Sequence, residues 1–218
     1  MKEHKRVFGM AEVYFDIIYM FSALAIGTYL VTTVHSQVKF LAGITALLLV
    51  SGDAFHLIPR IAAILTSREH QFARAMGIGK LITSVTMTIF YILLWEIGII
   101  LFSPHMNSLL QYIVYGLAAI RILLCLFPQN RWFDEHPPII WGIYRNIPFL
   151  MLGIATIMLF FSNASSVPAL GNMWLAIVLS FAFYIPVVLW SNINPKIGML
   201  MLPKTCTYLW MLIMFMYL

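Results

Sequence analysis

Charged residues are scarce in this sequence. Asp, Glu, Lys and Arg make up only 10% of the 218 residues, whereas hydrophobic residues make up 62% and the mean hydropathy is +0.92. A soluble domain of this length needs a polar surface for water to hydrate, and this composition does not provide one. The scarcity of charge therefore excludes a soluble globular protein and predicts that the chain is surrounded by lipid.

Cysteine is also scarce, and a basic stripe is missing. Cys125 and Cys206 both lie in apolar segments without a C-x-x-C or Cys/His ligand spacing, which excludes a disulfide framework and a zinc knuckle. The thirteen Lys and Arg residues give a formal net charge of +5, but they are scattered at the ends of apolar segments. We therefore expect no nucleic-acid partner, and we attribute the positive charge to membrane orientation.

The chain contains neither a linker nor a low-complexity tract. Seven apolar segments, each close to the roughly 20 residues that a bilayer needs, are joined by short connections. Their ranges are 9–33, 38–66, 77–102, 108–127, 139–161, 171–192 and 197–218. Acidic residues interrupt the first segment and no A-x-A-like cleavage site follows it, so we expect a retained first span. The sequence thus predicts an all-α integral membrane bundle of seven transmembrane helices that forms one domain over residues 1–218.

Positive charge is distributed unevenly among the connections, and this predicts the orientation. The Lys and Arg residues on one side of the predicted bundle are Lys2, Lys5, Arg6, Arg68, Arg74, Arg131 and Lys196. The connections at 103–107 and 162–170 carry neither residue type, and the connection between the first two spans has only Lys39. The positive-inside rule then places the N-terminus in the cytoplasm and the C-terminus outside, in a multi-pass protein of the cytoplasmic membrane.

The second span carries three ionisable residues, Asp53, His56 and Arg60, within an otherwise apolar run. Spacings of three and four place these side chains on one face of a helix. An ionisable side chain in hydrocarbon costs a few kcal/mol or more, so this face should point toward the protein interior or a water-filled cavity.

Most other polar side chains of the spans fall in the same, cytoplasmic half of the predicted bilayer. The residues that we expect to line a shared polar cavity there are Arg60, Arg121, Tyr144, Arg145, Asn146 and Tyr208. Pro59, Pro148, Pro186 and Pro203 interrupt four spans in or near that half, and a proline in a helix releases a backbone carbonyl. The sequence therefore predicts a cytoplasm-facing cavity, lined mainly by spans one, two, five and seven.

Two pairs of residues suggest the chemistry of this cavity. Glu12 and Asp16 are spaced i, i+4 on the first span, and Asp53 and His56 are spaced i, i+3 on the second. Together they form a candidate ligand set for a divalent metal ion such as Zn, Mn or Fe. Without metal, His56 is a candidate general base oriented by Asp53 or Asp16, with Arg60 or Lys204 stabilising negative charge.

A structural interpretation of the same charges stays open. Carboxylates and basic side chains at one depth in a bundle can neutralise each other as buried ion pairs that only hold helices together. The pairs that fit the predicted depths are Glu12 with Arg60, and Asp16 with Arg121 or Lys204.

Two short motifs add a resemblance to a known family. Ala11-Glu12 at an aromatic-rich start of the first span, and Ser51-Gly52-Asp53-Ala54-Phe55-His56 in the second, resemble motifs of the seven-helix superfamily of alkaline ceramidases and adiponectin-type receptors. The resemblance implies a membrane-embedded hydrolase of lipid amides or related substrates, with His56 as a zinc ligand and Ser51 nearby. The H-x-x-x-H of that family's last helix is replaced here by Lys204-Thr-Cys-Thr-Tyr208.

The sequence therefore leads to three functional hypotheses. The first is lipid-directed hydrolase chemistry around Ser51, Asp53, His56 and Lys204, with membrane lipids as partners and a lipid or small molecule as substrate. The second is a transporter or channel for a small polar solute or a proton, in which the same charges act as a relay. The third is a seven-helix sensor or receptor.

Overall fold

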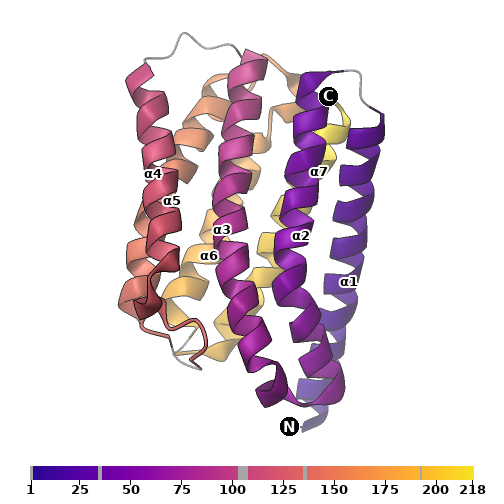
Figure 1. Ribbon diagram of the computed structural model, residues 1–218. Helices are drawn as coiled ribbons and strands as arrows, with labels where there is room; N and C mark the ends of the chain where they lie inside the picture. The colour runs from indigo at the N-terminus through magenta and orange to yellow at the C-terminus, as the bar shows by residue number, and fades with distance from the viewer. Residues whose placement is uncertain (1, 34–35, 103–107, 135–136, 192) are drawn as a thin grey trace.

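The computed structural model describes residues 2–33, 36–102, 108–134, 137–191 and 193–218. In these ranges the chain forms α-helices joined by short turns and 3₁₀ segments (Figure 1). The α-helices are α1 (Lys2–Thr32), α2 (Gln37–Thr66), α3 (Glu69–Phe102), α4 (Ser108–Leu126), α5 (Ile139–Ser162), α6 (Met173–Trp190) and α7 (Met201–Met216), and the 3₁₀ segments are η1 (Pro128–Asn130), η2 (Pro168–Leu170) and η3 (Pro195–Leu200). Seven stretches of the described chain are long and apolar enough to cross a membrane, which confirms the predicted seven-helix architecture.

Three helix starts differ clearly from the sequence-based expectation, and the first is that of α1, which begins at Lys2 and not at residue 9. α3 begins at Glu69, eight residues before the predicted 77. The reason is that α2 ends at Thr66, its C-cap residue Ser67 is left-handed (φ 54°, ψ 31°), and no Gly or Pro follows until Gly77. α7 begins only at Met201, so Pro203 lies in its first turn, where a helix has no intrahelical hydrogen bond to lose. Pro203 therefore lies within the seventh span, Lys196–Met216, but not in the interior of an α-helix, whereas the other three prolines lie inside helices.

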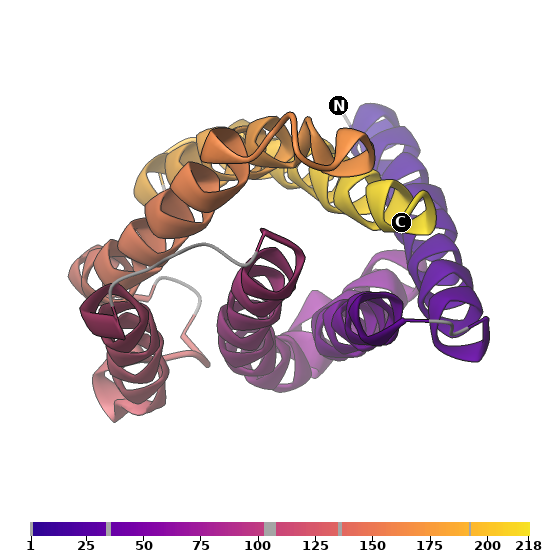
Figure 2. The same cartoon turned by 90° about the horizontal axis from the view of Figure 1, so that it is seen from above.

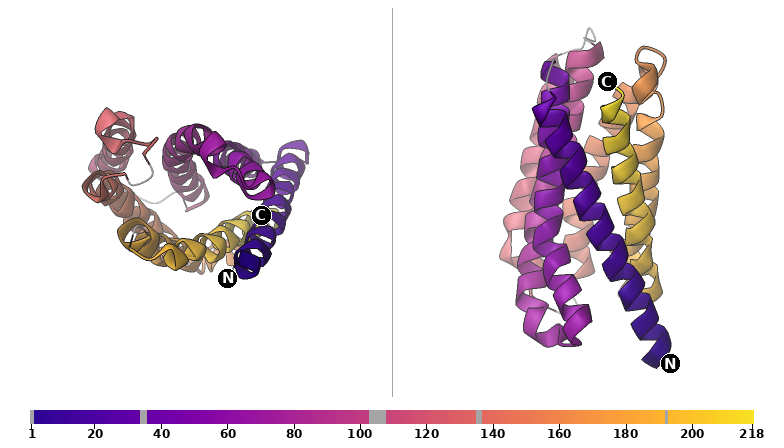
Figure 3. Two further views of the ribbon diagram at one scale, coloured as in Figure 1. Left: turned by 90° about the horizontal axis from the view of Figure 1, so that it is seen from below. Right: turned by 90° about the vertical axis from the view of Figure 1, so that its right-hand side faces the viewer.

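The helices follow one another around the bundle in chain order. Each helix packs against the next, and α7 packs against α1 and α2, which closes the ring (Figures 2 and 3). The short connections make neighbouring helices antiparallel. The end of the bundle at which α1 starts is therefore also the end at which α2 meets α3 and α4 connects to α5.

Aromatic side chains form the centre of the bundle. The ring of Tyr91 on α3 lies 5.0 Å from that of Phe149 on α5, and Phe149 lies 5.0 Å from Phe181 on α6. Phe90 and Tyr208 meet edge to face at 5.7 Å between α3 and α7. These rings are buried, and edge-to-face pairs of this kind add to the packing of the helices that carry them.

Glycines bring α2 and α3 into close contact. A Cβ atom on Gly79 would lie 2.6 Å from the Cα of His56, and one on Gly52 would lie 2.7 Å from the Cβ of Thr86. The Thr83 hydroxyl donates a 3.0 Å hydrogen bond to the Gly52 carbonyl across the same interface. Small residues allow such close approach of membrane helices, and here the approach places His56 beside the start of the apolar part of α3.

Candidate functional site

A cavity of about 300 Å³ lies between α2, α3, α4, α5, α6 and α7. The connection between α4 and α5 also lines it, so the cavity lies in the half of the bundle that contains the start of α1. The side chains that give the cavity its chemical character are His56, Lys80, Arg121, Arg145, Tyr184 and Lys204. Lys80 is exposed, so the cavity can be reached from outside the protein. We call it the cationic cavity.

The charged residues in the described wall of the cationic cavity are all basic. Two lysines, two arginines and one histidine line it, and no Asp or Glu occurs among the described lining residues. Like charges repel more strongly in a low-dielectric interior than in water. An anion in this space would be attracted by the two lysines and the two arginines.

Arg121 of α4 is the most buried of these basic residues. Its side chain is 2% exposed, and its guanidinium carbon lies 3.1 Å from the centre of the Phe149 ring. Its Nε and Nη1 atoms have no hydrogen-bond partner in the described chain. Buried donors in proteins are nearly always hydrogen-bonded, and an unpaired charged donor is costly. The unpaired nitrogens of Arg121 therefore indicate a position where a ligand or water supplies the acceptor.

Lys204 lies at the start of α7, on the wall between the cavity and α2. It is 7% exposed, and its Nζ lies 4.6 Å from the Tyr184 ring centre and 5.1 Å from that of Tyr208. Asp53 is its acidic electrostatic neighbour, but no ion pair to Lys204 occurs within the residues that the structure places. Two aromatic faces thus stabilise this ammonium group in addition to the nearby Asp53 carboxylate.

Arg145 is held in position by the connection after α4. Its Nη1 donates a 2.7 Å hydrogen bond to Oδ1 of Asn130, and its guanidinium carbon lies 4.2 Å from the Trp132 ring centre. Asn130 is fully buried, and its Nδ2 donates to the carbonyls of Leu124 and Phe127 at 2.7 and 2.8 Å. Asn130 therefore ties the end of α4 to the arginine of α5, which pre-organises one side of the cavity.

The acidic residues form a separate group between α1 and α2. Glu12 accepts hydrogen bonds of 2.8 and 3.3 Å from Arg60, so the structure contains the first of the ion pairs suggested by the sequence. The Tyr19 hydroxyl donates a 2.7 Å hydrogen bond to Asp53. Asp16 is buried, and its Oδ2 has no hydrogen-bond partner among the described residues. None of these acidic residues lines the cationic cavity.

The structure therefore divides the predicted polar chamber in two. Asp53 points to α1, whereas His56, one turn later, lines the cavity beside α3, and the electrostatic neighbours of His56 are the cations Lys80, Arg60 and Lys204. The helices that line the cavity are α2 to α7. The prediction that the first span also lines it is therefore wrong. These positions do not support the hypothesis that Asp53 or Asp16 orients His56 as a general base.

The candidate metal ligands do not converge. Within the described ranges, no group of three or more His, Cys, Asp or Glu side chains is placed to hold a metal ion. Glu12, Asp16, Asp53 and His56 therefore do not fit the divalent ion suggested by the sequence. Ser51 lies on another side of α2, in an apolar groove with α1, and its hydroxyl donates a 3.0 Å hydrogen bond to the Leu48 carbonyl. Ser51 and His56 thus do not share a cavity.

The other predicted cavity residues are split between several surroundings. Arg121 and Arg145 line the cationic cavity, whereas Arg60, Tyr144 and Tyr208 are not among its lining residues. Tyr144 is exposed and packs edge to face on Trp141 at 5.9 Å.

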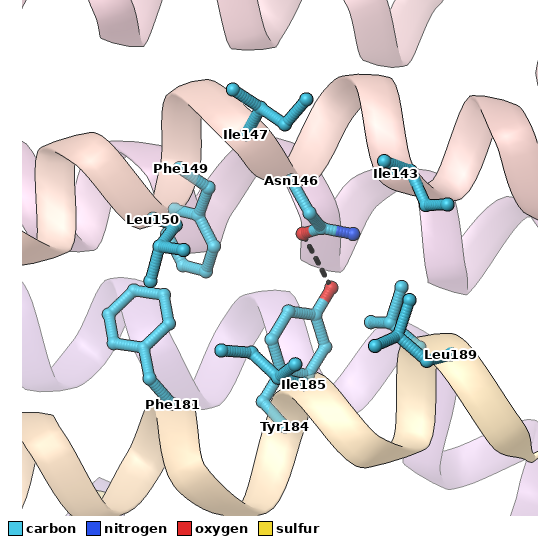
Figure 4. Close-up of a pocket in the computed structure, with 10 residues that line it drawn as sticks. Ile143, Asn146, Ile147, Phe149, Leu150, Phe181, Tyr184, Ile185 and Leu189 are labelled. Atoms are coloured by element: carbon cyan, nitrogen blue, oxygen red, sulfur yellow. Dashed lines mark hydrogen bonds between the residues drawn. The ribbon is translucent and has the colours of Figure 1, made fainter.

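A second, apolar groove adjoins the cationic cavity. The groove, about 140 Å³, lies between α5 and α6 and shares Phe149, Tyr184 and Val188 with the cavity wall (Figure 4). At the junction the Tyr184 hydroxyl donates a 3.0 Å hydrogen bond to Oδ1 of Asn146. We call this the α5/α6 groove.

Sequence reasoning did not select Lys80, Asn130 or Tyr184 as site residues. Lys80 directly follows Gly79 inside an apolar span. A charge beside a glycine that allows close helix packing was the feature of the sequence that could have indicated Lys80 as a site residue. Asn130 precedes the left-handed Arg131 in a turn that starts with Pro128, and nothing local indicates that it contacts Arg145.

Comparison of the chain with protein-family models, with curated proteins and with solved structures found no match. The resemblance to the alkaline ceramidase and adiponectin-receptor superfamily therefore stays a prediction based on its two short motifs.

Proposed function

We propose that this multi-pass membrane protein binds an anionic ligand in the cationic cavity. The observation that carries the proposal is Arg121, which is buried on the cavity wall with two nitrogens that lack an acceptor. A bound anion would accept hydrogen bonds from these nitrogens and would offset the cost of burying the charge. Carriage of an anion and sensing of an anion both begin with this binding step.

The number and type of cations favour a phosphate-bearing ligand. Lys80, Arg145 and Lys204 surround the same space as Arg121, so a ligand with two negative charges compensates the wall better than a singly charged one. A guanidinium group binds phosphate oxygens through two parallel hydrogen bonds, and lysine binds them as a point charge. The two residue types together match a phosphate group.

The expected orientation gives this ligand access from the cytoplasm. The cavity lies in the half of the bundle that contains the start of α1, and the positive-inside rule favours a cytoplasmic location for that half. The membrane concerned is, on this proposal, the cytoplasmic membrane.

A lipid-directed hydrolase is the second candidate. It is favoured by His56, whose Nδ1 has no hydrogen-bond partner in the described chain and which lines the cavity beside the proposed anion site. A neutral imidazole in this place can take a proton from water that attacks a bound substrate. The serine suggested by the family resemblance has no part in this version.

Thermal unfolding of the purified protein in a nonionic detergent tests the binding proposal. We expect inorganic pyrophosphate to raise the midpoint of unfolding relative to sodium chloride of equal ionic strength, because a ligand that binds only the folded state stabilises it. Arg121→Met and Lys80→Met should reduce this shift. Arg131→Met, at an exposed arginine outside the cavity, should retain it. An equal shift in all four proteins would overturn the proposal.

A further inference from the structure

We propose that the anionic ligand is a lipid whose phosphate head group occupies the cationic cavity and whose hydrocarbon chain lies in the α5/α6 groove. This inference rests on the proposed function, since it names the class of anion that the cavity receives. It is carried by a separate observation, which is the continuity between a charged cavity and an apolar groove.

The two spaces share part of their wall. Phe149, Tyr184 and Val188 line both the cationic cavity and the α5/α6 groove. A molecule that occupied both would have one end among the cations and the other end against isoleucine, leucine and phenylalanine side chains. This combination of surroundings fits an amphiphile better than a small hydrophilic anion, which would occupy the cavity but leave the apolar groove unused.

The α5/α6 groove is open to the membrane. Ile147 and Leu150 line it from α5 and are 52% and 36% exposed, so in a bilayer these side chains contact lipid chains (Figure 4). A lipid could therefore place its chain in the groove without leaving the hydrocarbon layer. Only its head group would need to move into the protein, where the cations replace its hydration.

Tyr184 marks the boundary between the two parts of the ligand. Its hydroxyl is bound to Asn146, and the face of its ring is directed at the ammonium group of Lys204. The ring of Tyr184 thus lies between the apolar groove and the ammonium group of Lys204. Phe149 is a second shared residue, and the guanidinium group of Arg121, with its two unpaired nitrogens, lies over the face of its ring.

A matched set of three probes tests the proposal in detergent micelles with the full chain. The probes are oleoyl lysophosphatidic acid, glycerol 3-phosphate, which is its head group without a chain, and monooleoylglycerol, which is its chain without the charge. Binding is measured by the change in intrinsic tryptophan fluorescence and checked by native mass spectrometry. We expect lysophosphatidic acid to bind at least tenfold more tightly than either of the other two.

Two variants separate the contributions of the cavity and the groove. Arg121→Met should weaken lysophosphatidic acid at least tenfold and leave monooleoylglycerol unchanged. Ile185→Trp, which fills the groove, should weaken lysophosphatidic acid but leave glycerol 3-phosphate unchanged. The control is Val178→Trp, two helical turns earlier on α6 and exposed but outside both spaces, and it should bind all three probes like the unmodified protein.

Each alternative outcome has a definite meaning. If glycerol 3-phosphate binds as tightly as lysophosphatidic acid and Ile185→Trp has no effect, the lipid proposal is overturned while the anion-binding function stands. If neither phosphate probe binds above the salt control, both proposals are overturned. If lysophosphatidic acid binds but Arg121→Met does not weaken it, the lipid is held by micelle partitioning and the proposal is again overturned.

Discussion

The guanidinium group of Arg121 on α4 covers the ring of Phe149 on α5, with 3.1 Å between the guanidinium carbon and the ring centre. This contact holds the charge at the wall of the cationic cavity while leaving two of its nitrogens unpaired. The Phe149 ring and the Cys125 thiol thus contact the guanidinium group, while Nε and Nη1 have no acceptor in the described chain. Such an arrangement is costly for the empty protein and favourable once an anion is bound.

Replacement of Arg121 should therefore weaken anion binding without lowering the stability of the protein. In protein without added anion, Arg121→Met should be at least as stable as the unmodified chain, with a gain of about 1 kcal/mol or more, because an unpaired buried charge is removed. Denaturation in detergent, followed by circular dichroism, measures this. Arg131→Met is the control and should change stability by less than about 0.5 kcal/mol. A loss of stability for Arg121→Met alone would show that the arginine has a structural partner.

The hydrogen bond between Tyr19 and Asp53 should contribute measurably to the packing of α1 on α2. Tyr19→Phe leaves the Asp53 carboxyl without this donor, so we expect a loss of about 1 to 3 kcal/mol in the free energy of unfolding. Tyr14→Phe, on the exposed side of α1, should have little effect. Equal stability of both variants would indicate that another donor replaces the Tyr19 hydroxyl.

Close packing at Gly79 should not tolerate a methyl group. In Gly79→Ala the new Cβ would overlap the backbone of α2 at Phe55 and His56, so we expect a loss of about 1 to 3 kcal/mol as the helices move apart. Gly116→Ala meets no atom within 4 Å and should be neutral or slightly stabilising. Unfolding midpoints of the two variants give the comparison, and an unaffected Gly79→Ala would contradict the helix approach described above.

The ion pair between Glu12 and Arg60 should give a measurable coupling energy in a double-mutant cycle of unfolding free energies. Its side chains are 31% and 36% exposed, so the attraction is partly screened and we expect about 0.5 to 1 kcal/mol. Glu12→Arg and Arg60→Glu should each destabilise the protein, and the exchanged double variant should recover part of the loss. Additive single effects in the double-mutant cycle would show that the pair makes no net contribution.

The orientation can be tested with single cysteines on the two ends of the bundle. In a background in which Cys125 and Cys206 are replaced by Ala, Ser67→Cys and Ser165→Cys place thiols at exposed positions on opposite ends. A membrane-impermeant maleimide applied to intact cells should label Ser165→Cys only, because the positive-inside rule places Ser67 in the cytoplasm. The reverse labelling pattern would place the cavity on the outer side.

Much of the architecture could be predicted because it depends on local properties of the chain. Whether a segment spans a bilayer is decided by its own length and hydropathy, so the seven spans agree with the structure except at ends such as Glu69 and Met201. The pairing of Glu12 with Arg60 was also foreseeable, because the sequence places both at one depth on adjacent helices.

The depth of each polar side chain could be read from the chain alone, since depth along a helix follows from residue number at ~1.5 Å per residue. Which of these side chains face each other depends on how the helices pack. Asp53 and His56 share a helical face in sequence, yet the packing of α1 and α3 against α2 directs one to Tyr19 and the other to the cationic cavity. Rotation of each helix about its axis is set by its neighbours, through contacts such as that of Gly79 on α3 with His56 on α2, and a single sequence does not display those contacts.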